Sequence, residues 1–425
     1  MKVYETVYNY YLNLMKAGDL KAGSKMPSLR ECEKVLNVSR TSVENGYLQL
    51  AADGYIYSVE KVGFFVTELA GRVGKQEEKK STEKTINKYK FDLAIIGEDR
   101  QVSCLNLWRR YMKSALRQED RLLSYSDYQG EKDLRKEIAN YVRKRRNIIC
   151  SEDDIVVGAG FQNLLQVLIA LIPGEKTISF PTKDFFDGAT TFRNAGFNVS
   201  YRNKESHVIY VTPSYMTKWG EVMTMQRRRE LCDHALNNNH LIIEDDYQNE
   251  FVFSSKPTPS LYALTGGVNT AFLGSFSRVV LPSVRISFII LPKGVKEEYD
   301  KIKRAYNQTA SKSEQIALAQ FLRDGHLNRH IKKMRRLYEE KRSVMEQAIN
   351  ANLSGKGEML IGESGMEIAI RMKDKSTFDK IIKQPVSVGI LDNSHENSTI
   401  LLSCSKIEID KIDEAVTLLL GSKSK

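Results

Sequence analysis

Apolar positions near the N-terminus recur at helical spacing and predict two short helices. Ser28 and Glu31 have the spacing of a capping box, which marks the start of the first helix. After the turn "NVS", Ser39 can cap the second helix, and Gly54 ends it. The inward-facing positions are Leu29, Cys32, Val35 and Leu36 in the first helix, and Val43, Tyr47, Leu50 and Ala51 in the second.

Two β-rich segments around "SVEKVG" come directly after these helices and predict a hairpin. Gly63 is expected in its tight turn, and Lys61 near its tip. The order is therefore a helix-turn-helix followed by a hairpin.

From residue 91 onward, strand-like apolar runs alternate with amphipathic helices, which predicts a large α/β domain around a mostly parallel sheet. In "DIVVGAGFQNLLQVLIALI", residues 155–157 are expected to form a buried strand that leads through Gly158, Ala159 and Gly160 into a helix. Backbone N–H groups at such a helix start can bind an anion. The domains expected are 1–69 and 91–425, joined by a linker over 70–90.

The linker is predicted from composition. Residues 71–90 are polar, lack helical or strand periodicity, and contain seven basic against three acidic residues. Two readings stay open for this segment: a solvated tether, or a segment that lies along a phosphate backbone.

Composition excludes some classes of protein. The 425 residues exceed the usual domain of about 100 to 200. No apolar run approaches the roughly 18 residues of a membrane span, and the N-terminus lacks a secretory signal, so a cytoplasmic protein is expected. Five scattered cysteines without CxxC spacing argue against disulfides and a zinc site.

The net charge of +11 permits a nucleic-acid partner, but its position matters more than its size. Residues 1–69 contain eight basic and eight acidic residues. Bulk charge therefore gives no support for DNA binding by this domain, and the case depends on individual residues.

The segment "AGDLKAGSKMPSLRECEKVLNVSRTSVENGYLQLAADGYIYSVEKVGFFV" resembles the winged helix-turn-helix of the GntR family of bacterial regulators. The resemblance implies that the start of the second helix enters the major groove of double-stranded DNA, while wing and first-helix cations contact the backbone. For Arg30 or Lys61 taken alone, the alternative is a solvated surface charge. The implied DNA-binding residues are Arg30, Ser39, Arg40, Thr41, Ser42, Lys61 and Gly63.

The rest of the chain is similar to the fold-type I aminotransferase domain. The resemblance depends on the ordered motifs "DYQGEKDLRKEIANYVRKRRNI", "GAGFQ", "HVIYVTPSY", "LIIEDDYQNEF" and "GSFSRVVLPSVRISFIILP". A GntR domain joined to it is the layout of the MocR subfamily of regulators. The resemblance implies an α+β winged helix-turn-helix joined to a large α/β aminotransferase fold-type I domain, and a homodimer with swapped domains.

In that family the large domain holds pyridoxal 5'-phosphate. By position, Asp245 would pair with the ring nitrogen of the cofactor and Tyr247 would donate to its ring oxygen. Phe185 would stack on the ring, with a core phenylalanine as the alternative. The phosphate would be bound by Gly160, Phe161, Gln162, Ser275 and Arg285.

Several positions around this pocket depart from the family pattern. Arg278 stands where the family has its Schiff-base lysine, and Ala159 where a serine is usual. No arginine follows Arg371 to bind a substrate carboxylate. Where the family commonly has His, Gln and Pro, this chain has Tyr215, Met216 and Lys218.

A guanidinium stays protonated and cannot form the covalent bond that a lysine forms, so no catalytic residue is expected. Arg278 would add positive charge beside a bound anion, or would fill the vacated space with a surface-reaching salt bridge. Lys218 is the one candidate substitute for the missing lysine.

The sequence thus predicts a transcription regulator that binds double-stranded DNA, forms a homodimer and senses a small-molecule effector, with pyridoxal phosphate held non-covalently if it binds. Two alternatives stay open: an aminotransferase with an accessory DNA-binding domain, and a regulator whose large domain is a ligand-free scaffold.

Overall fold

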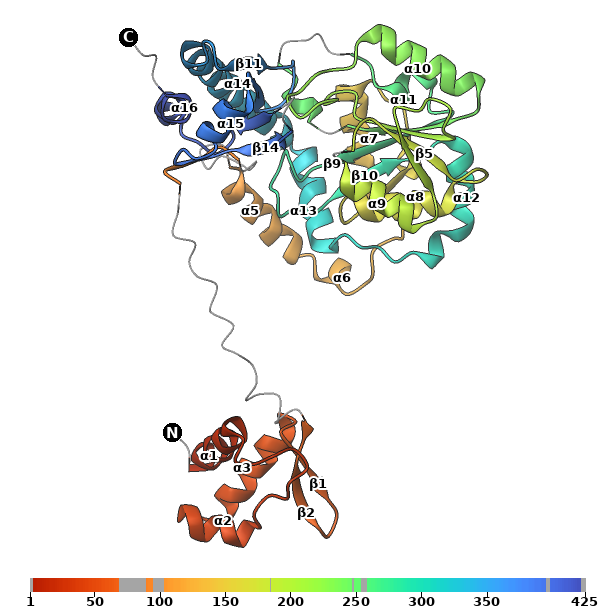
Figure 1. Cartoon of the computed structure of the whole chain (residues 1–425). Coiled ribbons are helices and arrows are strands. Elements are labelled where there is room, and N and C mark those ends of the chain that lie inside the picture. Colours follow the sequence, from red (N-terminus) through yellow and green to blue (C-terminus); the bar gives the residue numbers. More distant parts are fainter. Residues whose placement is uncertain are drawn as a thin grey trace. The chain divides into compact units, whose positions relative to one another are not determined.

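A computed structural model of the chain describes residues 3–68, 89–94, 103–183, 185–246, 248–253, 258–394 and 398–421. Contacts divide the chain into two compact units, Met1–Lys88 and Tyr89–Lys425, which are described separately (Figure 1). Tyr247 and almost all of the expected linker lie outside the described residues.

The small unit is a helix-turn-helix followed by an antiparallel hairpin, as the sequence predicts (Figure 1). Its core consists of side chains from all of these elements. The elements are α1 (Val3–Ala17), α2 (Leu29–Leu36), α3 (Arg40–Ala52), β1 (Ile56–Val59) and β2 (Gly63–Val66).

Caps define the start of α2, its end and the start of α3. The Ser28 amide donates to Glu31 Oε2 (2.7 Å) and the Glu31 amide donates to Ser28 Oγ (3.3 Å), which confirms the capping box. Asn37 ends α2 in the left-handed conformation, with φ 49°. Ser39 then caps α3 by accepting from the Ser42 amide (3.3 Å).

Two expectations for this unit were wrong in detail. Val35 is 65% exposed, so the apolar stripe of α2 is narrower than predicted and centres on buried Cys32. In the hairpin the turn spans residues 60–62 with Lys61 left-handed (φ 61°), and Gly63 follows the turn as the first residue of β2, with a positive φ of 128°. The tip therefore presents the exposed Lys61 side chain, as expected.

Helix α1 was not predicted from the sequence, because tyrosines and charges interrupt its apolar pattern. Its buried side chains, among them Val7 and Tyr11, pack on α3, and the Tyr11 and Tyr47 rings meet edge to face at 5.4 Å. A Cβ atom added to Gly46 would lie 2.9 Å from both Val7 Cβ and Val7 Cγ1, and 3.1 Å from the Tyr4 carbonyl oxygen. The two helices approach closely because position 46 has no side chain.

The substitution Gly46→Ala is therefore expected to destabilise the small unit by about 1 to 3 kcal/mol, since Val7 is stiff and the Tyr4 carbonyl is backbone. Hydrogen exchange of residues 3–68 would show faster exchange throughout α1 and α3. Asn45→Ala is the matched control, because Asn45 is exposed on the same helix. Equal protection in both variants would contradict the close contact.

The large unit contains a seven-stranded sheet with the order β4-β10-β9-β8-β7-β5-β6, in which β10 runs antiparallel to both of its neighbours and the other pairs are parallel. The mostly parallel sheet agrees with the prediction. The strands are β4 (Ile155–Gly158), β5 (Thr177–Phe180), β6 (Asn198–Tyr201), β7 (Val208–Val211), β8 (Leu241–Asp245), β9 (Thr270–Ser275) and β10 (Ser287–Ile290).

Helices cover both faces of this sheet because successive strand residues point to opposite sides. Ala271 and Leu273 of β9 belong to the core under α8, α9 and α12, whereas Phe272 belongs to the core that includes α5, α7 and α13. Helices α10 and α11 pack over a third cluster (Figure 1). These helices are α5 (Leu105–Leu116), α7 (Lys132–Arg146), α8 (Phe161–Leu171), α9 (Phe186–Asn194), α10 (Met225–Asn237), α11 (Leu261–Thr265), α12 (Lys293–Ile302) and α13 (Lys312–Arg323), with the short α6 (Glu119–Leu122) after α5.

The C-terminal part adds a four-stranded antiparallel sheet with the order β11-β12-β15-β14. The 27-residue helix α14 (His326–Asn352) leads into it from the large sheet. Among the described residues, no helix is both long and apolar enough to cross a membrane. The remaining elements are β11 (Gly357–Leu360), β12 (Glu367–Met372), α15 (Lys375–Ile381), β14 (Gly389–Asp392), β15 (Thr399–Ser403), α16 (Ile412–Leu420), and the pair β3 (Phe91–Asp92) and β13 (Val386–Ser387).

Candidate functional site

The first candidate site is the start of α3. The Ser39 and Ser42 hydroxyl oxygens lie 2.9 Å apart, and Ser39 also caps the helix, so both hydroxyls have partners within the protein. Arg40 and Thr41 are exposed in the same turn. These two side chains are the ones that this turn offers to an external partner.

Two of the other three predicted DNA contacts are exposed as well. Arg30 is exposed on α2, and Lys61 is exposed at the hairpin tip. Gly63 is half-buried, and a Cβ atom added to it would lie 3.3 Å from Lys25 Cε. Asn45, which the sequence reasoning did not consider, is exposed one turn after Thr41. The i to i+4 spacing of these two residues was the signal that could have found it.

The second candidate site lies at the carboxyl ends of the central strands of the large sheet. β8 ends at Asp245, β9 ends at Ser275, and β4 leads through residues 158–160 into α8. These strands run in the same direction, so their ends share one edge of the sheet. Crevices at that edge are the usual place for ligands in open α/β sheets.

One corner of this edge is suited to an anion. Gly160 begins α8 with φ 89°, and a Cβ added there would lie 2.9 Å from Arg285 Nη2. Glycine thus lets the guanidinium reach the helix start, where the first-turn N–H groups of Phe161 and Gln162 have no acceptor within the helix. Arg285 and Ser275 are exposed, and Ser275 Oγ accepts from the Ser277 amide (3.3 Å).

Asp245 is engaged by a tyrosine that the sequence reasoning missed. The Tyr210 hydroxyl donates to Asp245 Oδ2 at 2.5 Å, and burial raises the pKa of Tyr210 well above its usual range, with the Asp245 charge adding to the increase. Phe185 stacks on the Tyr210 ring, with centroids 4.7 Å apart. Phe185 also packs near Phe161 and Phe180. Its surroundings are therefore largely those of a core phenylalanine, the alternative given for it above.

A buried charge cluster lies directly after Asp245. Arg146 Nε contacts Asp246 Oδ2 at 2.6 Å, and the same guanidinium donates to Glu250, which also accepts from the Tyr141 hydroxyl. Burial raises the pKa of Asp246 to about 7, while the Arg146 charge works against the increase and the Glu250 charge adds to it. This Arg146 cluster fixes the chain that follows β8.

Arg278 is directed toward a buried carboxylate. Its Nη2 lies 3.5 Å from Oε1 of Glu367, which is 0% exposed on β12. Oε2 of Glu367 accepts from the Met366 amide (3.0 Å) and lies 3.0 Å from the Tyr215 hydroxyl. One alternative for Arg278 was a salt bridge that reaches the surface. That alternative was wrong, because the partner of Arg278 lies inside the protein.

Unpartnered polar atoms surround this ion pair. Within the described part of the chain, Arg278 Nε, Ser364 Oγ and both amide atoms of Gln248 are buried without a hydrogen-bond partner. Lys218, the candidate substitute for the missing Schiff-base lysine, has an exposed side chain. The Tyr215 hydroxyl lies 2.6 Å from the backbone carbonyl oxygen of Lys218.

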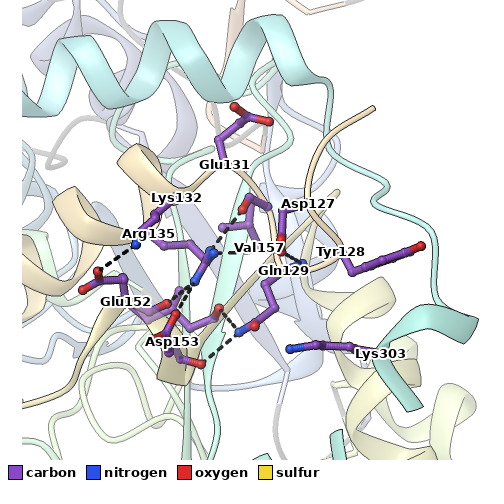
Figure 2. Close-up of polar contacts among 12 residues, drawn as sticks. Asp127, Tyr128, Gln129, Glu131, Lys132, Arg135, Glu152, Asp153, Val157 and Lys303 are labelled. Atoms are coloured by element: carbon purple, nitrogen blue, oxygen red, sulfur yellow. Dashed lines mark hydrogen bonds and ion pairs between the residues drawn. The ribbon is translucent and has the colours of Figure 1, made fainter. Parts of the chain in front are cut away.

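The loop before α7 holds β4, and with it the turn into α8, in place (Figure 2). The Gln129 side-chain amide donates to the carbonyl oxygens of Asp153 (2.9 Å) and Ile155 (3.1 Å), while the Val157 amide donates to the Gln129 carbonyl (2.9 Å). Arg135 donates to the Glu152 carbonyl at 2.7 Å. The motif "DYQGEKDLRKEI" therefore has a positioning role.

Both units match known families. Residues 3–66 match the family described as bacterial regulatory proteins, gntR family, and residues 96–209 and 197–417 match aminotransferase class I and II. The chain is 32% identical to an uncharacterised HTH-type transcriptional regulator of Bacillus subtilis, YhdI, over 91% of this chain and 87% of the relative. It is 25% identical to the probable rhizopine catabolism regulatory protein MocR of Rhizobium meliloti, over 84% of this chain and 78% of that protein.

Solved structures with a similar fold include aminotransferases. Kynurenine aminotransferase of Pyrococcus horikoshii superposes with a TM-score of 0.66 at 21% identity, covering 78% of this chain and 89% of that chain. At this level of identity the likeness concerns the fold of the large unit.

Proposed function

Since the chain belongs to the MocR subfamily of GntR-type transcriptional regulators, which join a helix-turn-helix domain to an aminotransferase-like domain, we propose that its small unit binds specific duplex DNA in the cytoplasm. We propose further that its large unit binds a phosphate-bearing effector without a covalent bond. The observation that carries the first proposal is the exposed pair Arg40 and Thr41 at the start of α3.

Arg40→Ala is expected to lower affinity for the operator by about 1 to 3 kcal/mol and to relax sequence specificity, because an arginine in the major groove reads base edges. Footprinting on the upstream region of its own gene provides the operator. Lys61→Ala should instead weaken binding to all sequences and flatten the salt dependence. Lys16→Ala, exposed at the end of α1, is the control. A full-length protein that protects no site at low salt would refute the proposal.

The large unit fits the phosphate end of pyridoxal 5'-phosphate. The close approach of Arg285 to Gly160 at the start of an eleven-residue helix supports this, since a helix N-terminus and a guanidinium both favour a phosphate. Asp245 and Tyr247 would face the ring, and the bound cofactor would supply a reactive carbonyl. The residue at the lysine position does not fit covalent attachment, because Arg278 offers no nucleophilic amine.

Arg285→Ala is expected to abolish measurable binding of phosphate-bearing ligands. It removes the cation beside Gly160 and leaves only the N–H groups at the start of α8. Calorimetry with pyridoxal phosphate, pyridoxamine phosphate and inorganic phosphate separates phosphate recognition from ring recognition. Arg304→Ala is the control, because Arg304 is an exposed arginine that is not part of this site. Equal and negligible heats for the unmodified protein and Arg285→Ala would leave the scaffold alternative.

We propose that the regulator is a homodimer. Large apolar side chains are exposed along α5 and the segment after α6, including Leu116 at 57%, Leu123 at 88% and Tyr125 at 101%. Exposed large apolar side chains in neighbouring segments favour a protein interface there. Domain exchange between protomers is the arrangement that the family resemblance implies.

A further inference from the structure

The net positive charge of the chain lies outside its DNA-binding unit. Residues 1–69 contain eight basic and eight acidic residues, whereas residues 91–425 contain 49 basic and 42 acidic residues. Because attraction to the phosphate backbone depends on local cations, a neutral small unit supplies little of it by bulk charge. The location of the surplus in the large unit therefore matters for DNA binding.

Several of these cations gather where α13 turns into α14. The Tyr111 hydroxyl of α5 donates to Asp324 (2.7 Å), which places α5 against this turn. Arg329 donates to the Asp324 carbonyl (3.1 Å) and lies 3.0 Å from His326 Nδ1. Burial lowers the pKa of His326, and the charges of Arg329 and Arg110 add to the decrease, so these two arginines lie in its surroundings.

The end of α7 joins the same surface. Arg145 donates to Asn328 Oδ1 through Nε (3.2 Å) and Nη2 (2.9 Å). Lys144 and Arg145 line a small hollow of about 40 Å³ together with Leu327 and Asn328. Cations from α5, α7 and α14 thus surround one corner of the large unit.

Helix α14 extends this surface along one side. Arg329, Lys332 and Arg336 are exposed at i, i+3 and i+7, whereas Ile331 and Met334 are buried on the opposite side. The sequence from His326 to Tyr338 contains no acidic residue. The corner surface is defined as Arg110, Lys144, Arg145, Arg323, Arg329, Lys332 and Arg336.

Ion pairs are few on the corner surface. On α12 and the turn after it, by contrast, Lys301 pairs with Glu298 (2.6 Å) and Lys303 with Asp300 (2.9 Å). In the described part of the chain, Arg323 is the single member of the corner surface with an ion pair, to Asp324 (3.2 Å). The other six members have no ion pair among the described residues, and a group of like charges repels itself unless an anionic partner neutralises it.

We propose that the corner surface binds the phosphate backbone of duplex DNA that flanks the operator, as a second DNA contact of the regulator. The proposal rests on the DNA binding proposed for the small unit. A duplex is favoured because its regularly spaced phosphates match a row of cations along a helix. The 20 residues between the described parts of the two units span at most about 70 Å when fully extended, which keeps the large unit near any DNA held by the small unit.

The test uses the full-length variant Arg110→Gln, Lys332→Gln, Arg336→Gln, whose replaced side chains have no hydrogen bond or ion pair in the described residues. Binding is measured against salt on a random-sequence duplex, on the shortest duplex that retains specific binding, and on one with long flanks. The slope of log K against log salt is negative, and each lost phosphate contact makes it shallower by about 0.9. On the random and long duplexes we therefore expect the magnitude of the slope to fall by about 2 to 3. Affinity for the shortest duplex should change less.

The control variant removes the same charge elsewhere, as Lys293→Gln, Lys301→Gln, Lys411→Gln, all exposed. An unchanged slope in the corner variant, or an equal change in the control, would overturn the proposal. A changed mass in sedimentation would also overturn it and assign the surface to contact between copies. Failure of the small unit is distinguishable, because Arg40→Ala should relax specificity for the operator while leaving binding to the random duplex and its salt dependence nearly intact.

Discussion

Borohydride reduction of the protein incubated with pyridoxal phosphate is expected to give no covalent adduct at position 278. A guanidinium stays protonated and delocalised, so Arg278 cannot provide the neutral amine that attacks a carbonyl. Peptide mapping after reduction measures the outcome. Transamination should also be absent. A stoichiometric adduct on Lys218 would contradict the non-covalent proposal, and Lys218→Arg would then abolish that adduct.

The Glu367 carboxylate extends this prediction to Arg278→Lys. Glu367 is buried and lies 3.5 Å from the Arg278 guanidinium, so a lysine at 278 would have a buried anion as its partner. A close carboxylate raises the pKa of an ammonium and keeps it protonated at neutral pH. Arg278→Lys alone should therefore give little adduct, whereas the double variant with Glu367→Gln should approach one adduct per chain.

Comparing these two variants shows whether Glu367 keeps the lysine at 278 protonated or whether the pocket does not bind the cofactor. If the single and double variants form adducts equally well, Glu367 does not control the charge at 278. If neither forms an adduct and both retain pyridoxal phosphate by calorimetry, the carbonyl does not reach position 278. Glu367→Gln alone is the control and should form none.

Local features of this fold could be predicted from the sequence, and long-range pairs could not. The capping box of Ser28 and Glu31 and the strand-to-helix turn at Gly160 depend on neighbours a few residues away. The partner of Arg278 is 89 residues distant, on a strand of a different sheet. Side-chain direction at such a position depends on packing, which a motif does not encode.

The same distinction explains the errors. Val35 fits a helical stripe by spacing, yet α2 buries only a narrow side, so this valine is exposed. Tyr210 was missed because only the parallel pairing of β7 with β8 brings its hydroxyl to Asp245. Tyr247, predicted to face the cofactor ring, lies outside the described residues and stays a prediction.

Arg146→Ala is expected to destabilise the large unit by about 3 to 5 kcal/mol, because it leaves Asp246 and Glu250 buried without their shared cation. Both tryptophans, Trp108 and Trp219, belong to the large unit, so their fluorescence in denaturant reports its unfolding specifically. Arg145→Ala is the matched control: Arg145 is the preceding residue, half-buried, and among the described residues its side chain donates to Asn328 alone, so its loss should cost less than about 1 kcal/mol.

The pH dependence of stability tests the Arg146 cluster independently. The pKa of Asp246 is about 7 in the folded protein, above its ordinary value of 3.8, so the folded state binds this proton more tightly than the unfolded state does. The stability that Asp246 contributes is therefore fully present below about pH 4 and is lost as the pH rises through 7. Asp246→Asn should flatten the decrease in unfolding free energy between pH 5 and 8, while Asp233→Asn, outside the cluster, should leave it unchanged. Parallel pH profiles for the unmodified protein and Asp246→Asn would show that Arg146 keeps both carboxylates ionised throughout this range.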